Sequence, residues 1–239
     1  MRAVHCFDNG VKVYDDQLVD AQRLRYAKSN VHEEDEEELF LRMINSLPAG
    51  GIFVSVGSAI GYYAFLAKRC RPDLMIHCFE PLEKHRSFLS ENIALNGFLE
   101  SDFKIHRFAI APSSDEYLLV NRSFGSFLVK PEDARSRPVS SVESVLLSEI
   151  GTLIGSDVID LLQMDIQGFE ALILEDHFSE PGSKIDIRSF LVGTHGESIH
   201  DRCRAVLGLH GYMVLHDEFA TPNQPDGILA AAKGDGRRS

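Results

Sequence analysis

The sequence predicts an α/β fold built on a doubly wound, mostly parallel sheet with an N-terminal helical extension. Over most of the chain, short apolar runs rich in β-branched residues alternate with segments of helical periodicity. The run over residues 52–56 leads into a turn bracketed by Gly57 and Gly61, and a second run, 75–79, is followed by the lone acid Glu80. A strand–turn–helix–strand unit of this kind is typical of sheets that bind nucleotides.

Ahead of this unit, residues 1–48 are predicted to form an extension or cap on a domain that covers 49–239. A helix is expected from near His32 to the sequence LPAGG, which is a strong stop signal. Before that helix the chain is polar and irregular, apart from a strand-like stretch at 11–14. The acids at 33–38 are expected to be the solvated first turns of the helix, because its dipole favours acids there, and a metal-binding role is the alternative.

Strands and helices then follow in alternation, and the last two strands are expected to form an antiparallel pair. The apolar run that ends at Met164 has the character of a fully buried parallel strand. The predicted strands are 52–56, 75–79, 103–110, 158–164, 189–194, 212–215 and 228–232. The predicted helices are 62–70, 84–96, 169–174 and 198–210. Between the third and fourth strands we expect a hairpin or extended insert at 116–120 and 126–129, a polar loop at 131–138, and a capped helix start at 140–143 leading to 147.

Composition restricts the classes of function. The net charge is −12 and no basic stripe is present, which argues against a nucleic-acid partner. Residues 221–225 (TPNQP) indicate a loop and not the Asn-Pro-Pro-Tyr or Asp-Pro-Pro-Tyr motif suited to nucleobase methylation. No apolar run approaches a membrane span, and the start lacks the apolar core of a signal peptide, so we expect a cytoplasmic protein. The four cysteines lack a Cys-x-x-Cys spacing, which favours buried free thiols over a metal site or disulfides.

Polar residues gather at the carboxyl ends of four predicted strands, where sheets of this type bind ligands. They are the turn 55–61, Glu80, Asp165 and His195. Glycine is needed where a ligand approaches the backbone, and Glu80 lies where the hydroxyls of a ribose would donate hydrogen bonds. The spacing Gly-x-x-x-Gly need not cradle a pyrophosphate, so S-adenosylmethionine fits better than a nicotinamide dinucleotide. Tight-turn chemistry and helix capping are the alternative explanation of the same residues.

Five segments together resemble the FkbM-type family of S-adenosylmethionine-dependent methyltransferases. They are 54–63 (VSVGSAIGYY), 78–81 (CFEP), 91–97 (ENIALNG), 164–170 (MDIQGFE) and 192–196 (VGTHG). The resemblance covers roughly residues 47–212 and implies a Rossmann-like class I methyltransferase fold with a seven-stranded sheet. It also implies transfer of a methyl group to oxygen, commonly a hydroxyl of a sugar, glycolipid or small secondary metabolite.

Several positions depart from the family pattern. Ser55 stands where an Asp is usual, Ala59 where an Asn is usual, Gln167 in place of an acid, and Gly193 where an acid is common. Without a carboxylate at Ser55, the amino group of the cofactor's methionine would be bound weakly or held elsewhere. The missing acids leave open a protein that binds the cofactor without turnover.

The resemblance and the strand ends together assign a cofactor site. Glu80 is expected to bind both ribose hydroxyls, with Pro81 and Leu82 near the adenine, and Phe108 and Ala109 lining the adenine site. Ordinary strand packing is the alternative for the last two. The residues expected to contact the cofactor are Ser55, Gly57, Ser58, Ala59, Gly61, Tyr62, Glu80, Pro81, Leu82, Phe108, Ala109 and Asp165.

The catalytic candidates are His195, Asp165, Gln167 and Glu170. An alcohol scarcely ionises at neutral pH and benefits from a general base, and imidazole titrates near that pH, so His195 is the predicted base. Asp165 is expected to orient the acceptor, contact the amino group or assist His195, unless it is only a helix N-cap. Gln167 is expected to donate to the acceptor. Glu170 is either a site residue or an acid of the first helical turn.

Three functions remain open at this stage. The leading one is an O-methyltransferase for a small-molecule or glycan acceptor, with residues 1–48 over the acceptor and no metal assigned. A non-catalytic module that binds an adenosyl ligand is the second, and a nicotinamide-dependent oxidoreductase is the third. The sequence does not identify the acceptor, and it leaves a homodimer open.

Overall fold

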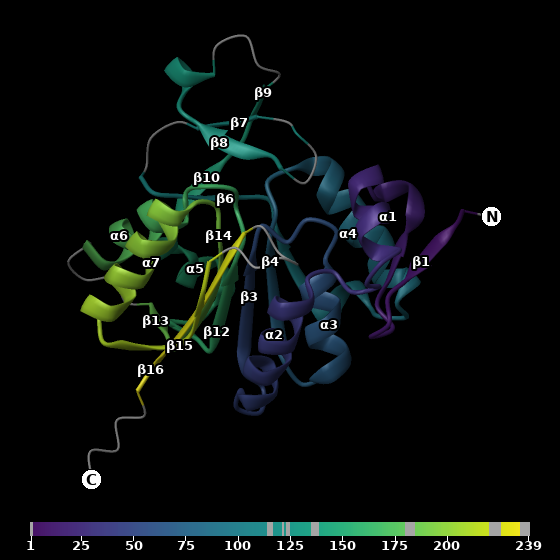
Figure 1. Ribbon diagram of the computed structural model, residues 1–239, viewed down its shortest axis with the longest axis horizontal. Helices are drawn as coiled ribbons and strands as arrows, with labels where there is room; N and C mark the ends of the chain where they lie inside the picture. The colour runs from purple at the N-terminus through teal and green to yellow at the C-terminus, as the bar shows by residue number, and fades with distance from the viewer. Residues whose placement is uncertain are drawn as a thin grey trace.

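The computed structural model describes residues 2–113, 117–120, 122, 125–134, 139–179, 185–219 and 226–234. At its centre lies a seven-stranded sheet with the strand order β15-β16-β14-β12-β3-β4-β5 (Figure 1). The strands are β3 (Ile52–Val56), β4 (Met75–Phe79), β5 (Phe103–His106), β12 (Leu161–Met164), β14 (Ser189–Thr194), β15 (Tyr212–Glu218) and β16 (Gly227–Lys233). Neighbours pair in parallel except β16, which is antiparallel to both β14 and β15. The predicted mostly parallel sheet is confirmed, and the sheet is mixed because of this one strand.

Helices cover both faces of the sheet, as a doubly wound fold requires. One face packs against α2 (Glu34–Ser46), α3 (Tyr62–Cys70) and α4 (Glu83–Leu95). The other packs against α5 (Ile150–Ile154), α6 (Glu170–Ser179) and α7 (Glu197–Leu209). Successive side chains of a strand point to opposite faces, so Phe53 joins the first core and Val54 the second. The same alternation directs Ser55 to the first face.

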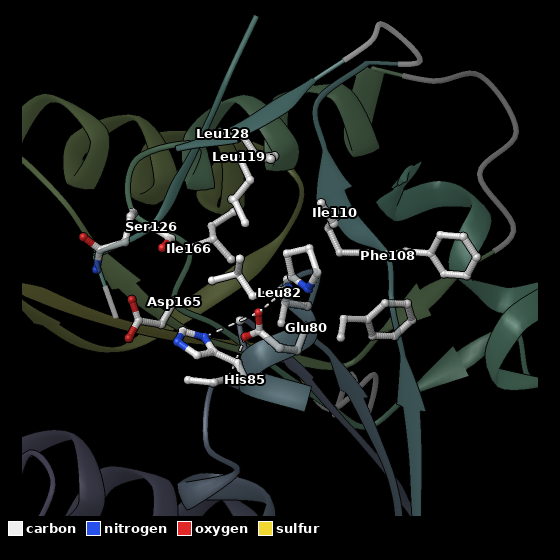
Figure 2. A pocket seen from close by; sticks show the side chains of 17 residues that line it. Glu80, Leu82, His85, Phe108, Ile110, Leu119, Ser126, Leu128, Asp165 and Ile166 are labelled. Carbon is white, nitrogen blue, oxygen red and sulfur yellow. Dashed lines mark hydrogen bonds and ion pairs between the residues drawn. The ribbon is translucent and has the colours of Figure 1, made fainter. Parts of the chain in front are cut away.

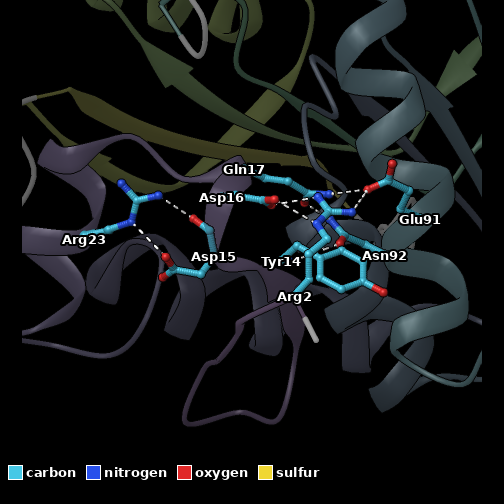
Figure 3. A network of polar contacts seen from close by, with 8 residues as sticks. All are labelled: Arg2, Tyr14, Asp15, Asp16, Gln17, Arg23, Glu91 and Asn92. Atoms are coloured by element: carbon cyan, nitrogen blue, oxygen red, sulfur yellow. Dashed lines mark hydrogen bonds and ion pairs between the residues drawn. The ribbon is translucent and has the colours of Figure 1, made fainter.

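The N-terminal segment is docked on α4. It contains an antiparallel pair, β1 (Val4–Cys6) with β2 (Lys12–Tyr14), followed by the short helix α1 (Asp20–Tyr26). Gln17 donates to Glu91 at 3.0 Å and accepts from buried Asn92 at 2.8 Å, and Arg2 donates to Glu91 at 2.7 Å (Figure 3). Asn92 also donates to the carbonyl of Ile60, at 3.2 Å. These contacts join the start of the chain to the turn before α3.

Two predictions on the N-terminal side need correction. Helix α1 was missed because its N-cap is Val19, which offers no capping side chain to read. The acidic run was expected to be solvated, but Glu36 and Glu37 are buried at 1% and 7% exposure. Helix α2 packs this side against α3, where Glu37 accepts hydrogen bonds from the hydroxyl of Tyr62 and, at 3.0 Å, from the amide of Asn9.

The predicted strand 103–110 is divided in two. After β5 the chain leaves the sheet, and β6 (Ala109–Ala111) pairs in parallel with β10 (Ser144–Leu146). The predicted helix start at 140–143 was therefore wrong, because residues 140 and 141 belong to β9 (Val139–Ser141) and residues 142 and 143 connect it to β10. The expected hairpin is confirmed as β7 (Leu118–Val120) with β8 (Phe127–Val129), and β9 pairs on the other edge of β7.

Some further predictions have simple outcomes. The run 158–164 is also divided, into β11 (Val158–Ile159) and β12, and β11 pairs with β13 (Asp186–Ile187). All four cysteines are free, but Cys6 and Cys70 are exposed, contrary to the expected burial. Within the described residues, no helix has both the length and the apolar character needed to cross a bilayer. The cytoplasmic location stays a prediction, and residue 116, residues 135–138 and the loop 221–225 lie outside the described residues.

Candidate functional site

The turn between β3 and α3 is held tightly by the protein itself. Gly57 has φ +82°, and a Cβ on this residue would collide with the backbone oxygen of Asp165. Gly61, at φ +91°, is the N-cap of α3, and a Cβ there would lie 2.6 Å from the ring of Phe65. Both glycines are thus required by packing between protein segments. The expected approach of a ligand to them stays a prediction.

Two residues without the freedom of glycine also have positive φ. Ala59 in the first turn has φ +47°, and Gln167 after β12 has φ +65°. Side chains in this region are strained, and such strain is concentrated at functional sites. Both residues stand at the carboxyl ends of neighbouring strands, and both line the two cavities described next.

Glu80 follows β4 and is only 4% exposed. Its carboxylate accepts the backbone N–H of Ala59 at 2.8 Å and that of Leu82 at 2.9 Å. It therefore joins the glycine turn to the start of α4, whose N-cap is Leu82. A carboxylate has about four acceptor positions, so acceptor capacity remains for further donors, and the alternative of an exposed helix cap is excluded.

The first cavity lies between the ends of β3, β4, β6 and β12, and its empty space, including the part open to solvent, is about 560 Å³. Figure 2 shows Glu80 and His85 at its base, with Leu119, Leu128 and Ile166 on the opposite wall. Its walls are largely apolar. The lining residues are Val56, Gly57, Ala59, Phe79, Glu80, Pro81, Leu82, His85, Phe108, Ala109, Ile110, Leu119, Ser126, Leu128, Asp165, Ile166 and Gln167.

The second cavity lies on the other side of the glycine turn, and its empty space, including the part open to solvent, is about 740 Å³. It shares Gly57, Ala59, Asp165 and Gln167 with the first, so the two adjoin along one edge. Its walls are mixed, more polar than those of the first cavity, and part of them comes from the N-terminal segment. The remaining lining residues are Gln22, His32, Glu33, Ser55, Ser58, Ile60, Tyr62, Tyr63, Gln163 and Asp226.

His195 follows β14 and is held by acids on several sides. Its Nδ1 lies 2.7 Å from buried Glu170, and its Nε2 lies 3.3 Å from Asp165 and 3.8 Å from Asp226. The amide nitrogen of Gln167 lies 2.6 Å from Nε2, so a neutral ring with its proton on Nδ1 accepts a hydrogen bond from this amide. The charged ring carries a proton on Nε2 as well, and it bonds to Gln167 only with the amide oxygen turned toward it. The four predicted catalytic residues therefore form one cluster.

The charges of this cluster set its protonation. Burial of the His195 ring opposes its charged form, but the hydrogen bond to Glu170 and the charges of Asp165 and Glu170 outweigh burial and raise its pKa to about 9. Burial raises the pKa of Asp165 to about 6, although the charge of His195 acts in the opposite direction. At neutral pH the pair is thus an imidazolium beside a carboxylate. Oδ1 of that carboxylate is the oxygen 3.3 Å from Nε2 of His195, and among the described residues it has no hydrogen bond beyond this ion-pair contact.

The structure brings most of the predicted cofactor residues together around the two cavities. Gly61 is the exception, because it lines neither. Among the catalytic candidates, Asp165 and Gln167 line both cavities, whereas His195 and Glu170 lie behind them. Sequence reasoning missed His85 and Asp226, the insert residues of the first cavity, and the N-terminal residues of the second. The others carry no sequence signal, because they reach the site through the docking of distant segments, whereas His85 lies in α4 directly after Glu80 and its position on that helix was the available signal.

No family model and no curated protein matches the chain. Solved structures do. A ribosomal protein L11 methylase from Lactobacillus delbrueckii subsp. bulgaricus is 13% identical, with a TM-score of 0.52 over 86% of this chain and 80% of its own. A precorrin-6y C5,15-methyltransferase from Geobacter metallireducens GS-15 is 12% identical, with a TM-score of 0.51 over 92% and 95%. The protein therefore has a Rossmann-like methyltransferase fold, and the FkbM-type family in particular is not shown.

The same comparison corrects one prediction. A candidate tRNA (m1A22) methyltransferase from Streptococcus pneumoniae, in complex with S-adenosyl-L-methionine, is 13% identical, with a TM-score of 0.49 over 84% of this chain and 75% of its own. Our exclusion of a nucleic-acid partner was wrong, because neither the fold nor the net charge excludes one. The exclusion rested on net charge, but binding depends on the local charge of one face and not on the sum over the chain.

Proposed function

We propose that the protein is an S-adenosylmethionine-dependent methyltransferase that acts on a hydroxyl of a sugar, glycolipid or small metabolite. The observation that carries the cofactor assignment is the charge around the glycine turn. Three carboxylates, Glu33, Asp165 and Asp226, line the second cavity, and no Lys or Arg is among the described residues that line either cavity. Burial lowers the pKa of His32 to about 3, so this side chain is neutral as well. Such a site suits a sulfonium cation and repels a pyrophosphate.

The cofactor lies across the turn in this proposal. Its adenosine part occupies the apolar first cavity, where the remaining acceptor positions of Glu80 bind the ribose hydroxyls. Its methionine part passes Gly57 and Ala59 into the polar second cavity. The first N–H groups of α3 have no partner within the helix and provide donors for the methionine carboxylate.

The reaction is an in-line displacement for which S-adenosylmethionine supplies the activated methyl group. The chain's own task is alignment and removal of a proton. Asp165 and Gln167 touch both cavities, so they orient the acceptor hydroxyl in this scheme. His195 remains the proposed base. Because the pKa of His195 is raised to about 9, most of its rings are protonated at neutral pH. Only the minor neutral form can accept the proton of the acceptor hydroxyl.

The cofactor assignment is tested by calorimetric titration with S-adenosylhomocysteine and, in parallel, with NAD⁺ and NADH. We expect binding of the first and none of the nicotinamide dinucleotides. The reverse result would make the oxidoreductase the better interpretation.

The acceptor class is tested with labelled S-adenosylmethionine and a panel of glycans, polyols and RNA. We expect label on a hydroxylated small molecule or glycan. Label on RNA would contradict the acceptor class and leave the cofactor assignment in place.

A non-catalytic binding module is the second candidate, and specific residues motivate it. Ser55 replaces the Asp usual in the family that the sequence resembles. Its hydroxyl donates to Gln163 at 2.9 Å, so it is already engaged. Binding of cofactor together with no methyl transfer to any member of the panel would favour this candidate.

A further inference from the structure

Glu33 is the acid that the N-terminal segment contributes to the second cavity. It is the N-cap of α2, its side chain is 13% exposed, and its ion-pair partner Arg25 lies 3.6 Å away. The other two acids of the cavity are paired with His195 instead. Asp165 and Asp226 lie 3.3 and 3.8 Å from the charged ring of His195, and Asp226 is 41% exposed. Glu33 is therefore the enclosed carboxylate of this cavity that His195 does not neutralise.

A second observation points to a ligand in the same place. Tyr63 lines the second cavity and is 7% exposed, yet its hydroxyl has no hydrogen-bond partner among the residues that the structure describes. Burial, together with the charges of Glu36 and Glu33, raises the pKa of Tyr63 well above its usual value, so the hydroxyl keeps its proton. A buried hydroxyl without a partner costs about 1–3 kcal/mol, and a polar ligand in the cavity would remove that cost.

The electrostatic environment of Glu33 also favours a cationic ligand in the cavity. Burial and then the charges of Glu36 and Asp165 raise the pKa of Glu33 well above its ordinary range, although Arg25 acts in the opposite direction. Burial and the neighbouring acids disfavour the anionic form of Glu33, and a positively charged group in the cavity would stabilise that form. The glycine turn offers no such acid, since Ser55 stands at the position where the resembled family has a carboxylate.

We propose that Glu33 binds the cationic amino group of the methionine part of S-adenosylmethionine, with the hydroxyl of Tyr63 as a further hydrogen-bond partner. The inference rests on the proposed function and extends it. The carboxylate missing from the turn after β3 is supplied by the segment that enters α2. An ammonium group has three donors, and Glu33 and Tyr63 offer acceptors from two different elements on the wall of the same cavity. The N-terminal segment is then part of the cofactor site.

The test compares two ligands that differ in this group. S-adenosylhomocysteine carries the amino acid, and 5′-methylthioadenosine has the same adenosine and sulfur without it. Calorimetry is carried out on the full chain, on Glu33→Gln and on the control Glu38→Gln, which changes the charge of an exposed residue of the same helix. We expect Glu33→Gln to weaken S-adenosylhomocysteine by about tenfold or more and to leave methylthioadenosine unchanged. Glu38→Gln should change neither.

Three outcomes would overturn the inference. The first is equal affinity of the unaltered protein for both ligands, and this outcome does not depend on whether a variant folds. The second is an unchanged preference for S-adenosylhomocysteine in Glu33→Gln. The third is an equal loss of both ligands in Glu33→Gln, which would show a structural role. Absence of binding of either ligand to the unaltered protein is a different failure, because it would overturn the proposed function itself.

Discussion

At the residue scale, the carboxylate of Glu80 combines a structural and a binding role. Two of its acceptor positions are taken by the backbone N–H groups of Ala59 and Leu82, at 2.8 and 2.9 Å. We expect Glu80→Gln to weaken S-adenosylhomocysteine and methylthioadenosine alike, by about tenfold or more, because both contain the ribose. The NH₂ group of the glutamine amide would also face one of the backbone N–H groups that the carboxylate accepts, and two donors cannot bond. The free energy of unfolding should therefore fall by about 1–3 kcal/mol.

Glu83→Gln is the matched control for this prediction. It makes the same change in the exposed first turn of α4, three residues away. Calorimetry measures the affinities and denaturant unfolding the stability. Unchanged affinity of Glu80→Gln for both ligands would show that Glu80 does not bind the ribose. A loss of affinity confined to S-adenosylhomocysteine would place Glu80 at the amino-acid end of the ligand.

The pH dependence of turnover distinguishes the two candidate bases. A base acts in its deprotonated form, so turnover rises with pH and levels off above the pKa of that group. Burial disfavours the charged ring of His195, but its acidic neighbours raise its pKa to about 9, whereas the pKa of Asp165 is about 6. If His195 is the base, turnover should rise about tenfold per pH unit from neutral pH and level off near pH 9.

His195→Ala provides the matching variant for the pH profile. It should lower turnover, remove the rise toward pH 9 and leave cofactor affinity nearly unchanged, because His195 lines neither cavity. A plateau that already begins near pH 6 in the unaltered protein would assign the base role to Asp165. An equal loss of turnover and cofactor affinity would make His195 a structural residue.

At the element scale, the sequence predicted elements well where local pattern and pairing agree. The strands that lead to Gly57 and Glu80 are short buried runs with clear turn signals, and the structure confirms both. The prediction was wrong at 140–143, where a Ser-x-x-Glu pattern indicated a helix. Pairing of β9 with β7 and of β10 with β6 decided that region, and such pairings join segments far apart in the sequence. The burial of Glu36 was missed for the same reason, because it depends on what packs against α2.

The glycine turn provides a prediction at this scale, with two glycines of similar backbone conformation. Gly57 has φ +82° and lies against Asp165, whereas Gly97 has φ +76° and a Cβ on it would meet nothing within 4 Å. Alanine at such φ values costs about 1–2 kcal/mol, so Gly97→Ala should lower the free energy of unfolding by that amount. Gly57→Ala should cost clearly more, because β3 and β12 must also move apart.

Gly57→Ala should in addition weaken S-adenosylhomocysteine, since the displaced turn separates the two cavities. Denaturant unfolding and calorimetry measure the two effects, and Gly97→Ala should leave the affinity unchanged. Equal destabilisation by the two substitutions would show that the turn has room for a side chain, and that backbone conformation alone explains Gly57.

At the scale of the whole molecule, the site was predictable in part. Sequence reasoning placed the cavity floor, because residues at the carboxyl ends of parallel strands necessarily meet at one edge of the sheet. Glu80 and Asp165 follow from that rule, and so does His195, which lies behind the cavities. The upper walls follow from no such rule. Glu33 and Gln22 belong to a segment that folds over the edge, and Leu119, Ser126 and Leu128 belong to the insert, so their positions depend on tertiary docking.

This docking makes the N-terminal segment part of the main core, which is a testable property of the whole molecule. Phe7 is 2% exposed, and its ring lies 4.8 Å from that of Tyr62 in α3 and 4.9 Å from that of Tyr26 in α1. The segment should therefore unfold together with the sheet in one transition. Phe7→Ala should cost about 3–5 kcal/mol and lower the midpoint of that transition by about 10 °C.

Leu24→Ala is the control, because Leu24 lies on the same segment and is 70% exposed. Its effect should stay within about 0.5 kcal/mol. Far-UV and near-UV circular dichroism should report coincident transitions in all three proteins. Two separate transitions, with Phe7→Ala shifting only the first, would show that residues 1–48 fold apart from the sheet. In that case the acid at position 33 could leave the cavity without unfolding the sheet, and the cofactor site would open and close with the N-terminal segment.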